Sequence, residues 1–334
     1  MVTLVGFVCL ISIPHFLIQL PAALSPETGA TGLRILCFDG GGVRGKASLL
    51  ILKEIMDQIG PGAKPCDFFD LIAGTSTGSL IAIMLARLRY SVDEAIKKYD
   101  EIGPRIFSNV ESPRKWMLYG TPVVPEGPAE KAFREIGHVN GEDQDMNSGV
   151  YHRCKVLLHL AVCGLFIHRN PEQCYVTTVL QDRPEKLVPI RSYHSADRSD
   201  PVTYARKKWK IWEAARAATA APVYFRPLEL NGRKFVDAGA GYNNPSAEVY
   251  HEVTKNIPEY KGWPVACFIS IGTGFGSRRP APGILERTDS VFGGLPKAKA
   301  VQDRASDLVQ YLSQIASATH KVDQEMRRTY MSRG

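Results

Sequence analysis

The chain has 334 residues, of which 44% are hydrophobic and 22% charged, and this composition fits one large globular domain or two small ones. Its formal net charge is +7, but the basic residues are dispersed, which argues against a nucleic-acid binder and leaves a solvated surface or attraction to anionic lipid headgroups. The seven cysteines are irregularly spaced without a C-x-x-C pair, which argues against a disulfide framework or a zinc ribbon.

Residues 2–25 contain no Asp, Glu, Lys or Arg. Their length suits a removable signal peptide or a membrane anchor. The lack of a preceding basic residue disfavours the signal, and Pro14 and His15 disfavour a continuous span. An uninformative extension is the third reading. We expect residues 1–28 to be a hydrophobic N-terminal segment, signal or anchor, followed by a linker, and the protein to be membrane-associated or otherwise cytoplasmic.

From Leu33 onward, apolar runs of strand length alternate with segments of helical periodicity, which predicts an α/β fold with a parallel sheet covered by helices. Strands are expected at 33–38, 68–73, 234–237 and 265–271. Helices are expected at 47–59, 79–88, 91 to about 102, 209–220, 246–256 and about 297–328. A capping box at 91–94 and the pair Asn244-Pro245 provide two of the helix starts.

The glycine-rich segment 40–46 (GGGVRGK) follows the first of these strands and partly matches two phosphate-binding motifs. A P-loop requires Ser or Thr after the lysine, where Ala47 stands, and a dinucleotide site requires an acidic residue at the end of the next strand, whereas Asp67 precedes its strand. In either case the segment offers backbone N–H groups at a helix N-terminus. Such groups bind an anion, either a phosphate or the oxyanion of acyl transfer.

Two further motifs also stand at strand ends. Gly74-Thr75-Ser76-Thr77-Gly78 lies between an apolar strand and an apolar helix, where small neighbours permit a sharp bend that exposes the serine hydroxyl. The motif is common by chance, but this position favours a nucleophile over an ordinary glycine turn. Asp237-Ala238-Gly239 follows a later strand, and alone it would be read as a turn aspartate.

In this order the three motifs resemble the patatin family, which has an Asp-Gly-Gly-Gly-x-Arg-Gly oxyanion loop, a Gly-x-Ser-x-Gly elbow and an Asp-Gly-Gly or Asp-Gly-Ala base. The resemblance runs from about residue 33 to 276. It implies a three-layer α/β sandwich with a mainly parallel central sheet flanked by helices. It also implies hydrolysis of phospholipid or other acyl-lipid esters at a membrane surface, independently of calcium and with no metal or other cofactor.

The resemblance also assigns roles to individual residues. Ser76 would be the nucleophile and Asp237 the general base of a dyad. The oxyanion hole would be formed by Gly40, Gly41, Gly42 and Arg44, and the remaining motif glycines are Gly45, Gly74, Gly78 and Gly239. The catalytic domain would span 29–290, with a C-terminal helical region at 291–334.

The sequence departs from the family pattern in two places. Ala238 replaces the usual glycine after the catalytic Asp, which would strain the turn if that position needs a positive φ. Residues 138–170 form a divergent insert that contains a hydrophobic run at 157–167. The cysteines and histidines at 154, 159, 163, 168 and 174 have no common zinc-finger spacing, so we do not expect a metal site there.

The proposed chemistry is coherent from the residues alone. An Asp with an ordinary pKa of about 3.9 is a weak base for a hydroxyl, so Asp237 would need an apolar setting that raises its pKa. Most of the stabilisation would come from N–H groups of the glycine loop. A histidine triad is the alternative, since His251 and His320 follow Asp237. Both lie in expected helices, where a surface or packing role is the simpler interpretation.

Two other functions are also compatible with the sequence. One is a phosphate- or nucleotide-binding module that uses the 40–46 loop, although no clear second acidic motif supports it. The other is a catalytically weak or inactive lipid-binding relative, although both Ser76 and Asp237 are present. Protein partners and oligomeric state cannot be read from the sequence.

Overall fold

A computed structural model of the chain describes residues 2–5, 32–106, 122–139, 142–146, 173–193 and 209–274, together with 322, 324–326 and 328. The apolar residues 6–25, the hydrophobic run 157–167, His320 and most of the expected C-terminal helix lie outside the described residues. In the part of the chain that is described, no helix is long and apolar enough to cross a membrane.

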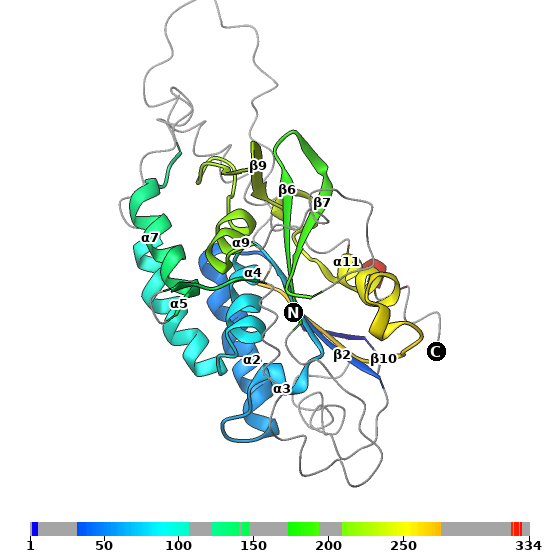
Figure 1. Cartoon of the computed structure of the whole chain (residues 1–334). Coiled ribbons are helices and arrows are strands. Elements are labelled where there is room, and N and C mark those ends of the chain that lie inside the picture. The colour runs from blue at the N-terminus through cyan, green and yellow to red at the C-terminus, as the bar shows by residue number, and fades with distance from the viewer. Residues whose placement is uncertain are drawn as a thin grey trace, which may run out of the picture.

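The described residues build an eight-stranded mixed sheet in the order β1-β10-β2-β3-β6-β9-β8, with β7 paired to β6 (Figure 1). The strands are β1 (Val2–Val5), β2 (Leu33–Phe38), β3 (Leu71–Thr75), β6 (Gln173–Leu180), β7 (Arg183–Arg191), β8 (Leu228–Leu230), β9 (Arg233–Asp237) and β10 (Val265–Ile271). Neighbours are parallel from β10 through β2 and β3 to β6, and the other pairings are antiparallel. The short strands β4 (His138–Val139) and β5 (Glu142–Asp143) form a separate pair.

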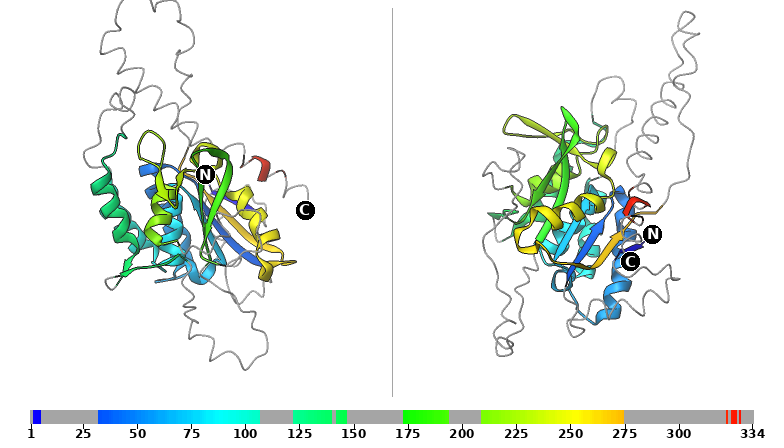
Figure 2. Two further views of the ribbon diagram at one scale, coloured as in Figure 1. Left: turned by 45° about the horizontal axis from the view of Figure 1, so that its top comes forward. Right: turned by 90° about the vertical axis from the view of Figure 1, so that its right-hand side faces the viewer.

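Helices cover both faces of the sheet, as Figures 1 and 2 show, so the predicted α/β sandwich is confirmed. One layer contains α2 (Gly45–Ile59), α4 (Thr77–Ala82), α5 (Val92–Ile106), α7 (Glu126–Gly137) and α9 (Ile211–Ala218), and the other contains α11 (Ser246–His251). Successive side chains of a strand point to opposite faces of the sheet. Leu36 and Ile72 therefore pack in the hydrophobic core on one face, and Ile35, Cys37 and Leu71 pack in the core on the other face.

Several predicted boundaries hold and others shift. The capping box is present: the Ser91 amide donates to Glu94 Oε2 at 2.6 Å and the Glu94 amide to Ser91 Oγ at 3.2 Å. The helix that it opens continues to Ile106, beyond the predicted end. The strand expected at 68–73 begins only at Leu71, because Pro65 opens a short helix, α3 (Pro65–Phe68).

The structure adds a strand, β1, ahead of the first strand expected from the sequence, β2. Val2–Val5 pairs antiparallel with β10, with Val2 opposite Ile271 and Val5 opposite Phe268. Part of the N-terminal segment assigned to a signal or anchor is therefore an edge strand of the sheet. A short apolar strand and the start of a signal peptide have the same composition, and pairing with a strand more than 260 residues away is not a local property of the sequence.

Candidate active site

Ser76 lies on a strained turn between β3 and α4. Its φ is 54° and its ψ is −125°, a conformation that side-chain-bearing residues rarely adopt and that commonly persists at functional sites. The turn requires glycine on both sides, because a Cβ on Gly74 would overlap the Gly78 backbone and a Cβ on Gly78 would overlap the Phe38 carbonyl. The local geometry therefore has the strand, sharp turn and helix expected of a nucleophile elbow.

The sheet brings Ser76 and Asp237 together through β6. Thr75 at the end of β3 is opposite Thr177, and Asp237 at the end of β9 is opposite the next residue, Thr178. Because β7 pairs with one edge of β6, β3 and β9 both pair with its other edge. Strand β3 is parallel to β6 and β9 is antiparallel, so β3 and β9 run toward each other and their C-terminal ends meet. Ser76 Oγ donates a hydrogen bond of 2.6 Å to Asp237 Oδ2.

Burial makes Asp237 a stronger base than an ordinary aspartate. Asp237 is only 6% exposed, and the removal of its carboxyl group from water raises its pKa from 3.8 to about 6. Hydrogen bonds from the Ser76 hydroxyl and from the Gly239 amide, the latter 2.8 Å from Oδ1, limit the rise. The carboxylate is thus ionised at neutral pH, and the hydrogen bonds that its two oxygens accept fix its orientation.

The turn after Asp237 is not strained by Ala238. Ala238 has φ −76° and ψ −5°, which is right-handed helical backbone open to any residue. The expectation that alanine strains this position was conditional on a positive φ, and that condition is not met. Gly239 then begins the short helix α10 (Gly239–Tyr242).

The glycine loop supplies fewer available amides than the motif suggests. The Gly40 amide donates to Asn243 O at 3.1 Å, and the Arg44 amide donates to Gly41 O at 3.2 Å. The amides of Gly41 and Gly42 have no acceptor among the described residues. Gly42 has φ 56°, which favours glycine. A Cβ on Gly40 would come within 3.0 Å of Ser76 Cβ, so the loop lies directly against the elbow.

Gly45 and Lys46, the last two residues of the glycine segment, both contact α5. Lys46 Nζ forms a 2.8 Å ion pair with Asp100 Oδ2 of α5, and both side chains are about half exposed. A P-loop lysine would instead reach over the phosphates. Gly45 begins α2 and packs so closely on Tyr99 that an added Cβ would lie 2.5 Å from the tyrosine hydroxyl. This arrangement disfavours the nucleotide-binding alternative.

His251 does not hydrogen-bond to the Asp237 carboxylate. His251 is exposed at the end of α11, and the hydrogen bonds of the Asp237 carboxylate come from Ser76 and Gly239. Among the described residues, the Asp237 carboxylate therefore has hydrogen bonds from Ser76 and Gly239 and from no histidine.

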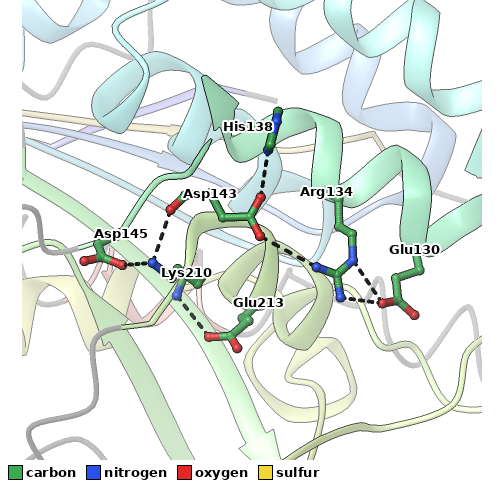
Figure 3. Close-up of polar contacts among 7 residues, drawn as sticks. All are labelled: Glu130, Arg134, His138, Asp143, Asp145, Lys210 and Glu213. Atoms are coloured by element: carbon green, nitrogen blue, oxygen red, sulfur yellow. Dashed lines mark hydrogen bonds and ion pairs between the residues drawn. The ribbon is translucent and has the colours of Figure 1, made fainter. Parts of the chain in front are cut away.

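A second polar cluster, which the sequence did not reveal, joins α7, the β4–β5 pair and α9 (Figure 3). It consists of Glu130, Arg134, His138, Asp143, Asp145, Lys210 and Glu213. Arg134 contacts both Glu130 and Asp143, and Lys210 Nζ pairs with Asp145 at 2.8 Å. No group of His, Cys, Asp and Glu in the described ranges could hold a metal. These contacts fasten the strand pair at the start of the insert to α9.

Comparison with known proteins gives a family and several relatives. A sequence model described as "Patatin-like phospholipase" matches residues 36–250. The chain is 30% identical over 251 residues to "Calcium-independent phospholipase A2-gamma" of Oryctolagus cuniculus, which covers 73% of this chain and 28% of that protein. It is 26% identical over 319 residues to "Phospholipase A I" of Arabidopsis thaliana, and the match covers 85% of this chain and 24% of that protein. It is 36% identical over 270 residues to "Patatin-like protein 2" of Oryza sativa subsp. indica, covering 71% and 58%.

Proposed function

Because the chain belongs to the patatin-like phospholipase family, we propose that it hydrolyses carboxylic ester bonds of phospholipids or related acyl lipids through a Ser76–Asp237 dyad. The family supports a lipid acyl hydrolase in general. The observation that carries the finer proposal is the 2.6 Å hydrogen bond from Ser76 Oγ to the buried Asp237 carboxylate. Release of fatty acid from phosphatidylcholine vesicles by the purified protein, compared with Ser76→Ala, tests it.

The reaction begins when Asp237 accepts the Ser76 proton and Ser76 Oγ bonds to the ester carbonyl carbon. The resulting oxyanion accepts hydrogen bonds from the amides of Gly41 and Gly42. The C–O bond to the alcohol then breaks, and the leaving alkoxide takes the proton from Asp237. Water attacks the acyl-enzyme with Asp237 again as base, which releases the fatty acid and restores Ser76.

The activity should depend on a single ionisation near pH 6. Only ionised Asp237 accepts the proton, and burial raises its pKa to about 6. We expect log(kcat/KM) for a short-chain ester to rise with unit slope below this pH and to level off above it. A titration of the rate between pH 4 and 9, with folding checked by circular dichroism, measures the profile. A mid-point near pH 4 or a fall in rate above pH 6 would contradict the assignment.

Turnover should not require calcium. In the proposed mechanism neutral backbone amides stabilise the oxyanion, and they need no cation. Activity in EGTA or EDTA is expected to match activity in added calcium within assay error. Loss of turnover in chelator that calcium restores would contradict the amide assignment. The names of several relatives describe calcium-independent phospholipases.

We also propose that the lipid surface meets the start of α2. The large hydrophobic residues that are exposed in the described part of the chain are Val43, at 68%, and Leu50, at 48%. They are seven residues apart, about two helical turns, with exposed Ala47 between them. Val43 directly follows Gly42, so this apolar stripe is continuous with the glycine loop. A bilayer presenting its acyl ester to the loop would bury the stripe.

Replacing both large side chains by serine should weaken action on vesicles. Each side chain contributes about 1 kcal/mol when buried in lipid, so the double variant Val43→Ser with Leu50→Ser loses about 2 kcal/mol. We expect vesicle binding and vesicle hydrolysis to fall by about thirtyfold. Hydrolysis of a soluble short-chain ester should be unchanged. The double variant Val43→Leu with Leu50→Met is the matched control, and it should keep both vesicle hydrolysis and soluble-ester hydrolysis. An equal loss on both substrates would contradict the bilayer contact.

A further inference from the structure

The carbonyl side of the glycine loop is held by side chains from distant parts of the chain. Gly40 O accepts hydrogen bonds from Asn243 Nδ2 at 3.2 Å and from Thr273 Oγ1 at 3.1 Å. Asn243 directly follows α10, and Thr273 lies two residues after the end of β10. Both residues are buried, with 6% and 7% exposure. Two donors from separate elements therefore converge on one backbone oxygen.

The next two carbonyls of the loop are held in the same way. Gly41 O accepts from the amide of Arg44 at 3.2 Å and from its Nε at 3.4 Å. Gly42 O accepts from the Tyr99 hydroxyl at 2.6 Å. Three consecutive carbonyl groups thus each have a donor, whereas the amides of Gly41 and Gly42 have no acceptor among the described residues.

A fixed carbonyl fixes the amide of the following residue. The peptide unit is planar and trans, so its C=O and N–H point in opposite directions. Donors on Gly40 O therefore direct the Gly41 N–H away from Asn243 and Thr273. The contact is close, because a Cβ on Gly41 would overlap the Thr273 side chain and a Cβ on Gly40 would overlap Asn243 Oδ1.

From this geometry we infer that Asn243 and Thr273 are positioning residues of the oxyanion hole, which act by orienting the Gly41 amide. The inference rests on the proposed function of the site. Neither side chain needs to contact the substrate, since both act through the peptide bond between Gly40 and Gly41. Their loss should therefore affect the oxyanion, which exists only in the transition state and intermediate, more than the bound ester.

Other threonine and asparagine substitutions provide matched controls. Thr273→Val removes the hydroxyl with little change of shape, and Thr273→Ser retains it. Thr254→Val removes a comparable hydroxyl, whose 2.8 Å bond goes to Tyr250 O on another part of the fold. Asn244→Ala is the control for Asn243→Ala, because Asn244 is equally buried but its Oδ1 accepts from the Ser246 amide instead.

The experiment measures kcat and KM for a soluble ester and inhibition by a phosphonate that mimics the tetrahedral intermediate. Loss of an oxyanion donor costs about a hundredfold or more, so a misaligned donor is expected to lower kcat about tenfold in Thr273→Val and in Asn243→Ala. KM should change little, and phosphonate inhibition should weaken in parallel with kcat. Thr273→Ser, Thr254→Val and Asn244→Ala should resemble the wild type.

Two results would overturn the inference. If Thr273→Val keeps wild-type kcat, or if the controls lose as much activity as the test variants, the bonds to Gly40 O do not position the hole. If Asn243→Ala fails to fold, the three threonine variants decide the question. A wild-type protein without ester hydrolysis would instead refute the proposed function, and this inference with it.

Discussion

Ser76→Ala protein is expected to fold normally and to lose ester hydrolysis by more than about a thousandfold, since removal of a serine nucleophile removes the covalent step itself. The substitution deletes one oxygen and leaves the strained turn at φ 54° in place. Turnover of a fluorogenic ester, with thermal unfolding measured in parallel, gives both results.

The matched control for this variant is Ser79→Ala. Ser79 stands in the same elbow, but its hydroxyl is buried and donates to Gly74 O at 2.7 Å. Its loss should lower stability modestly, by about 1 kcal/mol, and keep most of the activity. Near-wild-type turnover by Ser76→Ala would remove Ser76 from the mechanism.

Asp237→Asn should abolish activity and at the same time stabilise the fold at alkaline pH. Burial raises the pKa of Asp237 from 3.8 to about 6. The protonated carboxyl group therefore favours the folded state. This contribution to stability is complete below the unfolded pKa of 3.8 and is lost as the pH rises through about 6. Asparagine is never ionised, and its Oδ1 still accepts from Gly239. At pH 8 the variant is expected to exceed the wild type by about 2 to 3 kcal/mol in unfolding free energy.

Urea unfolding at pH 4 and pH 8 tests this second prediction. The stability difference between variant and wild type should grow between the two pH values, while fatty-acid release stays near background at both. His251→Ala is the control for the histidine alternative, because this exposed residue should be dispensable. A His251→Ala protein as inactive as Asp237→Asn would contradict the dyad.

The elbow could be predicted because its requirements are local. Gly74, Ser76 and Gly78 are close in sequence, and a sharp turn between an apolar strand and an apolar helix needs small residues at those positions. The strand β9 could be predicted as well, because its apolar residues are also close in sequence. The direction of β9 in the sheet could not be predicted, and the contact between Ser76 and Asp237 depends on the register of β3 and β9 along β6.

The parts that sequence reasoning missed depend on long-range contacts. Charged residues and Pro189 in β7 hide the alternating pattern of the β6–β7 hairpin, so this hairpin was not predicted. The motif named Gly40 and Arg44 as oxyanion-hole residues, but their amides are used within the fold. Asn243 and Thr273 stood next to recognisable motifs, yet only the folded chain brings both side chains to Gly40 O.

The central claim is that Ser76 carries the acyl group of a lipid ester during turnover, with Asp237 as its base. Trapping this intermediate is the most direct test: the protein is mixed with a phospholipid labelled in its acyl chain, quenched in acid within the first turnovers, and digested for mass spectrometry. We predict an acyl mass on the peptide that contains Ser76, absent in Ser76→Ala. Steady fatty-acid release without acylation of Ser76, or acylation of another residue, would contradict the account.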